Sequence, residues 1–229
     1  MSVPPLAATT RTARPPLAHI AIEGPIGAGK LALATRLADR WGMTTLFDSN
    51  TANPFLERSY RDASSASRYA LAAQLHFALD RERLAQEATA LLAAGKPLVT
   101  NFITERNDLF ARLTLSDEEL SLYETLAKRL VAHAPPPDLV VYLQASPEVL
   151  YARIQKRGKP AELTLSDAFL RALCDSYNEF FYHYDHAPVL TVGAEHLNLL
   201  DSEADLALIA ERIETMRGRK ESFVKGTSL

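Results

Sequence analysis

A glycine-rich turn that ends in a lysine is the feature of this sequence that points most directly to chemistry. Four residues separate Gly24 from Gly29 and Lys30, and this spacing is typical of a loop whose backbone N–H groups surround phosphate oxygens. An apolar run at residues 20–22 precedes the turn, and good helix formers follow it over residues 30–38. A plain turn rich in glycine and proline would need neither neighbour, so we predict a strand, a phosphate-binding loop and a helix.

One position of this loop departs from the usual pattern. Leu31 stands next to the loop lysine, where a serine or threonine hydroxyl normally ligates Mg²⁺. A leucine side chain has no lone pair to offer a metal ion, although phosphates and water can hold Mg²⁺ directly. The loop therefore predicts phosphate binding, while its capacity for phosphoryl transfer stays open.

Composition narrows the class of protein. The chain has 25 Lys and Arg against 28 Asp and Glu, a formal charge of -3, so no global basic field is present to hold a nucleic acid. The single Cys174 cannot form an internal disulfide, which fits a reducing compartment such as the cytoplasm. No apolar run reaches the ~18 residues of a membrane span. We expect a cytoplasmic protein with neither a nucleic-acid nor a membrane partner.

Apolar, β-branched segments alternate with segments of helical pattern along the chain. The predicted strands are residues 20–23, 43–47, 97–101, 139–143 and 189–192. This alternation predicts an α/β fold with a five-stranded parallel sheet flanked by helices. Ligands bind at the carboxyl ends of such strands, where Asp48 and Asn101 stand at the ends of two of them.

The packed part of the chain is expected to form one domain at residues 19–216, a length that supports a single core. Residues 1–18 are rich in proline, alanine and threonine and are expected to be a flexible tail. A transit peptide is the alternative, but two proline pairs disfavour the helix that it needs. Residues 217–229 are expected to be a C-terminal tail.

A cluster of cations lies in residues 153–159, the end of a helix predicted to start at residues 146–148. Arg153, Lys156, Arg157 and Lys159 lie within seven residues. They are either a solvated helix end or a cationic lid over bound phosphates.

Several segments together resemble the bacterial deoxynucleoside kinases, in the same order over about residues 18–195. These segments are residues 23–30, 53–57, 72–75, 109–111, 137–145, 147–148, 156–158 and 180–185. The resemblance implies a P-loop kinase fold and a homodimer. It also implies transfer of the γ-phosphoryl group of ATP to the 5′-hydroxyl of a deoxynucleoside, with Mg²⁺, in nucleotide salvage.

The resemblance also assigns the phosphate side of the site. Lys30, Arg153 and Arg157 would act on the transferring group, Asp48 would be the base toward the 5′-hydroxyl, and Arg81 would lie near that hydroxyl. The implied ATP-binding positions are Gly24, Pro25, Ile26, Gly27, Ala28, Gly29, Lys30, Leu31, Arg153 and Arg157.

The nucleoside side follows in the same way. The implied positions are Tyr60, Gln74, Phe77, Arg81, Asn107, Phe110 and Glu162. Tyr60 and Glu162 correspond to the contacts with the sugar 3′-hydroxyl, and Gln74 to paired hydrogen bonds with the base. A buried glutamine satisfied by the backbone would look the same, and the two phenylalanines could be core residues instead of flanking the base.

The chain departs from the family at four positions that carry acids or hydroxyls. Asp48 replaces a glutamate, Asn101 replaces an acid that helps to organise Mg²⁺, and Asn107 replaces a further acid near the base. Glu105 or Asp108 could substitute if the alignment shifts. With Leu31 in the loop, the metal ligands are therefore unassigned.

Two hypotheses of different class follow. The chain is a working deoxynucleoside kinase, with purine deoxynucleosides as the first choice of substrate, or it is a degenerate relative that binds nucleotide or nucleoside with little transfer.

Overall fold

The computed structural model describes residues 17–48, 53–56, 63–130 and 135–226 of the chain. Along them lie β1 (His19–Glu23), α1 (Lys30–Trp41), β2 (Thr44–Leu46), α3 (Ala63–Ala93), β3 (Leu98–Thr100), α4 (Arg106–Thr114), α5 (Asp117–Leu130), β4 (Leu139–Gln144), α6 (Pro147–Arg157), α7 (Pro160–Leu163), α8 (Asp167–His183), β5 (Val189–Gly193), α9 (Glu203–Thr215) and β6 (Lys220–Val224).

The sheet has six strands in the order β2-β3-β1-β4-β5-β6, and every pair is parallel. The α/β fold was predicted correctly, but the prediction of five strands was wrong by one. The sixth strand, β6, uses part of the stretch expected to be a C-terminal tail. Its residues alternate between exposed and half-buried, because an edge strand faces solvent and lacks the apolar run of a central one.

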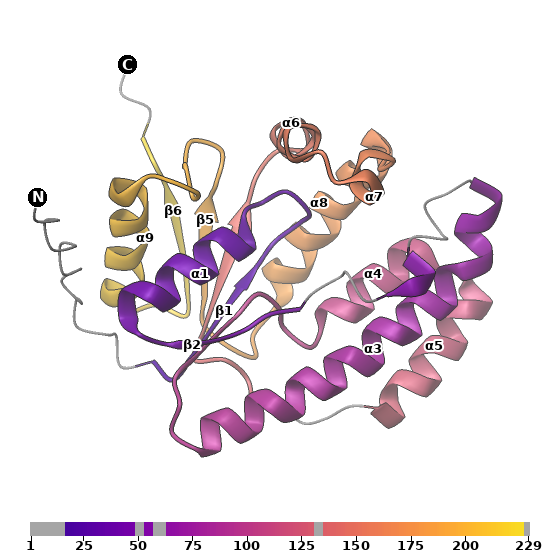
Figure 1. Ribbon diagram of the computed structural model, residues 1–229, viewed down its shortest axis with the longest axis horizontal. Helices are drawn as coiled ribbons and strands as arrows, with labels where there is room; N and C mark the ends of the chain where they lie inside the picture. Colours follow the sequence, from indigo (N-terminus) through magenta and orange to yellow (C-terminus); the bar gives the residue numbers. More distant parts are fainter. Residues whose placement is uncertain (1–16, 49–52, 57–62, 131–134, 227–229) are drawn as a thin grey trace, which may run out of the picture.

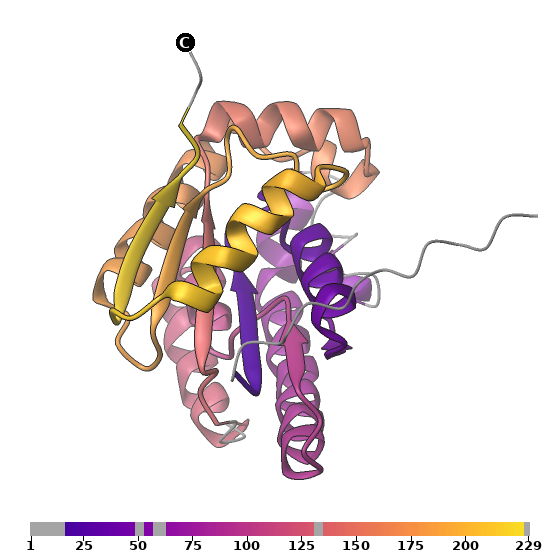
Figure 2. The ribbon, with the colours of Figure 1, turned by 90° about the vertical axis from the view of Figure 1, so that its left-hand side faces the viewer.

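Two layers of helices cover the sheet (Figures 1 and 2). Helices α1 and α9 pack on one face, where residues such as Leu37 and Ile209 meet Ile22 and Val141 of the sheet. Helices α4 and α8 pack on the other face through a cluster that includes Tyr177 and Val140. Alternate residues of β1 and β4 point to opposite faces, and both faces are covered. The central strands are therefore buried on both sides.

Helix boundaries follow local capping chemistry. Ser116 and Glu119 form the reciprocal capping box predicted for α5, with Glu119 N–H donating to Ser116 Oγ at 3.3 Å and Ser116 N–H donating to Glu119 Oε2 at 3.1 Å. Gly42 ends α1 in the left-handed conformation, as predicted. Asn53 accepts hydrogen bonds from Phe55 N–H at 3.1 Å and Leu56 N–H at 3.3 Å, as a cap of the short helical turn at residues 54–56.

In the part of the chain that the structure describes, no helix is both long enough and apolar enough to cross a bilayer.

Candidate active site

The phosphate loop, residues 24–29, connects β1 to α1 and depends on glycine at both ends. Gly24 has φ +147°, and a Cβ there would approach the backbone oxygen of Leu143 to 2.5 Å. Gly29 has φ +99°, and a Cβ there would meet Leu199 Cδ1 at 2.9 Å. Only glycine fits both positions without strain. Because α1 starts at Lys30, the unpaired N–H groups of its first turn are available to an anion at the loop.

Lys30 folds back onto the phosphate loop. Its Nζ donates to the backbone oxygens of Gly24 at 2.6 Å and Pro25 at 3.1 Å. Burial and the positive charge of Arg106 lower the pKa of Lys30 to about 8, although Glu23 and Asp48 partly oppose the shift. A phosphate oxygen would replace these carbonyl acceptors and favour the charged ammonium. Lys30 is thus positioned for the phosphate contact that its place in the motif predicts.

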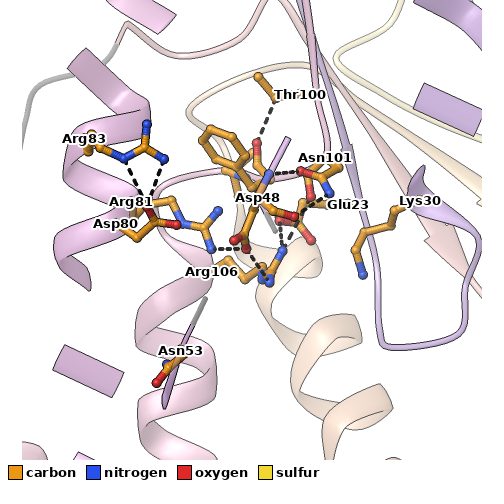
Figure 3. A network of polar contacts seen from close by, with 12 residues as sticks. Glu23, Lys30, Asp48, Asn53, Asp80, Arg81, Arg83, Thr100, Asn101 and Arg106 are labelled. Atoms are coloured by element: carbon orange, nitrogen blue, oxygen red, sulfur yellow. Dashed lines mark hydrogen bonds and ion pairs between the residues drawn. The ribbon is translucent and has the colours of Figure 1, made fainter. Parts of the chain in front are cut away.

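Opposite the loop, Asp48 follows the carboxyl end of β2 and is held by two arginines (Figure 3). Its Oδ2 accepts hydrogen bonds from Arg81 at 2.9 Å and Arg106 at 3.0 Å. The carboxylate is only 3% exposed. Burial by itself would raise the pKa of Asp48, but Arg81 and Arg106 outweigh it, so the pKa lies below its usual value. Asp48 is therefore an ionised carboxylate at neutral pH.

A second buried carboxylate, Glu23, lies at the end of β1. It accepts hydrogen bonds from Gly24 N–H at 3.0 Å, Ile103 N–H at 3.1 Å and Tyr177 OH at 3.1 Å. Arg106 lies 3.8 Å away. Glu23 thereby joins the phosphate loop to the segment after β3 and to α8.

We call Glu23, Asp48, Arg81, Asn101 and Arg106 the acceptor edge, because the resemblance implies that Asp48 and Arg81 lie near the acceptor hydroxyl and the other three side chains lie close to them (Figure 3). Neither Glu23 nor Arg106 was predicted to have a role in the site. A carboxylate ending an apolar strand was a usable signal for Glu23, whereas nothing in the sequence around Arg106 indicates a buried ion pair.

Arg81 retains unused hydrogen-bonding capacity. Its side chain is 4% exposed, and its guanidinium lies 4.6 Å from the centre of the Phe102 ring. Besides the contact with Asp48, the buried Nε and NH1 atoms have no hydrogen-bond partner among the described residues. Buried donors without acceptors cost free energy, so this arrangement is typical of a site where a ligand supplies the oxygen acceptors.

Arg153 and Arg157, the two arginines of the cation cluster, are held by different partners. Arg153 donates to the backbone oxygen of Ala194 at 2.6 Å, so its guanidinium is held by the turn after β5. Arg157 forms an ion pair with Glu162, and its charge contributes to the lowered pKa of Lys30. Arg157 therefore acts electrostatically on the phosphate loop, while Glu162, expected at the sugar, is bound to this arginine.

Five of the seven predicted nucleoside positions lie on α3 and α4. Gln74 is buried and donates through Nε2 to Thr114 Oγ1 at 3.0 Å. The Phe110 ring meets Tyr177 edge-on at 6.4 Å and Arg106 at 5.6 Å, so it is in part a packing residue. Phe77 and Asn107 are half-buried on the same two helices. Tyr60 lies outside the described residues.

The side chains at the phosphate loop and the acceptor edge do not fit a Mg²⁺ ion held by the protein. Leu31 is 54% exposed and offers only carbon. Asn101 Oδ1 accepts from Asp48 N–H at 2.7 Å, and its Nδ2 donates to the Asp48 backbone oxygen at 3.3 Å. Glu105, an alternative acid, instead pairs with His186 at 2.8 Å. Over residues 17–48, 53–56, 63–130 and 135–226, no group of three or more metal-ligating side chains is found.

A glycine-rich loop at the carboxyl edge of a parallel sheet, with a buried carboxylate and arginines opposite it, defines the P-loop kinase class. Within that class, the deoxynucleoside kinase family matches residues 20–217, and the chain belongs to this family.

Two curated relatives come from Bacillus subtilis (strain 168). A deoxyguanosine kinase is 29% identical, with 86% of this chain and 96% of the relative covered. A deoxyadenosine/deoxycytidine kinase is 28% identical, with 86% and 92% covered. The fold is similar to that of a deoxyadenosine kinase from M. mycoides solved with bound dCTP. That match has a TM-score of 0.72 and 22% identity, and it covers 86% of this chain and 100% of that one.

Proposed function

We propose that this protein transfers the γ-phosphoryl group of ATP to the 5′-hydroxyl of a deoxynucleoside. The observation that carries the proposal is the ionised Asp48 beside Arg81, whose buried Nε and NH1 lack acceptors among the described residues. A sugar hydroxyl would give Arg81 an oxygen acceptor and would give the carboxylate a proton to accept. Lys30, at the end of the phosphate loop, interacts electrostatically with Asp48.

In this reaction the 5′-oxygen attacks the γ-phosphorus, the bond from that phosphorus to the bridging oxygen of ADP breaks, and the hydroxyl proton passes to Asp48. Both arginines donate to Oδ2, so Oδ1 is the oxygen assigned to the proton. Asp48 is a weak base because its pKa is lowered. A weak base suffices because the transition state of phosphoryl transfer is loose and needs little prior deprotonation. Lys30 and the loop N–H groups would stabilise the phosphoryl charge.

The names of the relatives indicate a purine deoxynucleoside as the first substrate to test, with Gln74 as the base contact. We further propose a cytoplasmic homodimer, by analogy with the family. The Gln74 amide already bonds Thr114, so the base would share or replace this partner.

A coupled assay of ADP release, run with ATP, Mg²⁺ and each common deoxynucleoside in turn, tests the reaction. We expect turnover, and we expect Asp48→Asn to lower kcat by about a hundredfold or more. Asp167→Asn is the matched control, since Asp167 is 59% exposed in a surface ion pair. No turnover with any deoxynucleoside would reject the proposal.

The second candidate is a relative that binds nucleotide without efficient transfer. Leu31 and Asn101 favour it. Leu31 has no side-chain oxygen, and the Asn101 amide is already hydrogen-bonded to the Asp48 backbone, so both positions lack a free oxygen ligand for a metal ion. Calorimetric binding of ADP in a protein that shows no turnover would select this candidate over the first.

A further inference from the structure

Arg106 occupies a central position that the proposed function does not yet explain. It is the first residue of α4, and its side chain is 11% exposed. It donates to Asp48 Oδ2 at 3.0 Å, lies 3.8 Å from Glu23 Oε1 and contacts the Asn101 backbone oxygen at 3.4 Å. These three partners stand at the carboxyl ends of β2, β1 and β3, which are neighbours in the sheet. One guanidinium therefore bridges three strand ends at the edge where ligands bind in such sheets.

Three of the four carboxylate oxygens of Asp48 and Glu23 already accept hydrogen bonds from protein donors; Asp48 Oδ1 is the exception among the described contacts. Asp48 Oδ2 is shared by two arginines, and both oxygens of Glu23 accept hydrogen bonds. A divalent ion that sought these oxygens would have to displace donors and approach a fixed cation closely. The arrangement therefore disfavours a metal ion held by protein carboxylates.

The charge balance points in the same direction. Lys30, Arg81 and Arg106 carry three positive charges against the two carboxylates Glu23 and Asp48. Burial would lower the pKa of Arg106, but Glu23 and Asp48 raise it above its usual value, so this cation persists. The site has one excess positive charge before any ligand binds, and a phosphate group complements it.

We propose that Arg106 is a positioning residue that supplies the fixed positive charge at the acceptor edge, in place of a divalent cation held by the protein. The proposal rests on the proposed function, because it explains how this site holds a nucleotide and keeps Asp48 oriented without metal ligands at positions 31 and 101. It requires that nucleotide binding depend on Arg106 and depend little on Mg²⁺. It also requires that removal of Arg106 free carboxylate oxygens for a metal ion.

Calorimetric titration of ADP, in buffer with Mg²⁺ and in buffer with EDTA, tests this directly. For the wild-type protein we expect the two Kd values to agree within about threefold. Arg106→Met keeps the length and loses the charge; in EDTA it should weaken binding by about tenfold or more, and Mg²⁺ should recover much of the loss. Arg106→Lys keeps the charge and should stay within about threefold of wild type.

Arg112→Met is the matched control. Arg112 lies on the same helix α4, but it is 63% exposed and pairs with Glu124 at the surface. This variant should bind ADP as the wild type does. The proposal is overturned if wild-type binding weakens tenfold or more without Mg²⁺, or if Arg106→Met binds ADP in EDTA as tightly as wild type. If Arg106→Met does not fold, the comparison of the wild-type Kd for ADP in Mg²⁺ with that in EDTA decides.

Failure of the kinase proposal gives a different signature. A wild-type protein that binds no ADP in either buffer rejects the nucleotide function. Urea unfolding of Arg106→Met, Asp48→Asn and the double variant then still measures the coupling of the two residues. Additive losses would overturn the role of Arg106, and a double variant clearly more stable than additivity predicts would support it.

Discussion

The phosphate loop and the acceptor edge are proposed to bind adjacent parts of one substrate complex, but they are built in different ways. The loop is a local structure whose shape depends on glycine. The groups that it would offer to a phosphate are mostly backbone N–H groups. The acceptor edge gathers five buried or nearly buried side chains from positions 23, 48, 81, 101 and 106. A backbone site tolerates substitution beside it, whereas a charged side-chain cluster depends on every partner. The departures from the family pattern are therefore expected to matter more at the acceptor edge.

The largest effect is expected from Gly24→Ala in the phosphate loop. The added methyl group would clash with the Leu143 backbone oxygen at 2.5 Å, at a φ of +147°, so we expect a loss of about 3 kcal/mol or more in unfolding free energy. Gly95→Ala is the control, since it also has positive φ but nothing lies within 4 Å of its Cβ. It should cost about 1 kcal/mol. Equal losses in urea unfolding would show that the loop is not tightly constrained.

The acceptor edge is tested next by the stability of Asp48→Asn. Loss of this carboxylate leaves Arg81 and Arg106 buried beside each other, and we expect a cost of about 3 kcal/mol in urea unfolding at neutral pH. The control Asp167→Asn removes an exposed partner of Arg171 and should change stability by less than about 1 kcal/mol. If both variants lose the same amount, the acceptor edge contributes no more than a surface pair.

The same contrast explains what the sequence could predict. The phosphate loop, the caps of Ser116 and Asn53 and the alternation of strands and helices are encoded by residues close together in the chain. The glycine-rich turn between a strand and a helix, the two caps and the alternation were predicted and found, while phosphate binding by the loop stays a prediction. The edge strand β6 was missed because its residues alternate between exposed and half-buried and lack a buried apolar face.

The acceptor edge was predicted only in part. The resemblance indicated Asp48, Arg81 and Asn101, but the ion pairs among them depend on which strands become neighbours. Because β3 lies between β2 and β1, Arg106 reaches both carboxylates. No local sequence pattern encodes that contact. From the sequence alone, the site was therefore described by the metal ligands that it lacks.

Lys30 provides a test of pH dependence that separates the loop from the acceptor edge. Burial, followed by the charge of Arg106, lowers its pKa from 10.5 to about 8. A lowered lysine pKa means that the ligand-free protein gains stability as pH rises from about 8 toward 10.5 and loses it again as pH falls through this window. Bound phosphate should raise the pKa, so ADP binding near pH 8 should take up about half a proton.

Calorimetry in buffers of different ionisation enthalpy measures this uptake. Lys30→Met should abolish it and weaken ADP binding by about 2 kcal/mol, whereas Lys96→Met, at an exposed position, should change neither. Proton uptake that persists in Lys30→Met would place the titrating group elsewhere.

The smallest effect is expected from adding oxygen donors at the two departing positions. Leu31 is exposed, so Leu31→Thr should fold normally and add a hydroxyl at the start of α1. Asn101→Asp keeps an acceptor for Asp48 N–H but gives up the 3.3 Å donation to the Asp48 backbone oxygen. Together they offer a metal ion two oxygens that no arginine holds in the present structure. We expect the double variant to turn over about tenfold faster, or roughly 1.4 kcal/mol of barrier, with a smaller gain for either single change.

Mg²⁺ titrations of kcat and of ADP affinity check this prediction. A faster double variant whose nucleotide affinity now depends on Mg²⁺ would show that these two positions decide between a metal ion and an arginine as the source of charge. A double variant no faster than the parent at saturating Mg²⁺ and ATP would show that Arg106 already supplies what the absent ligands would have held.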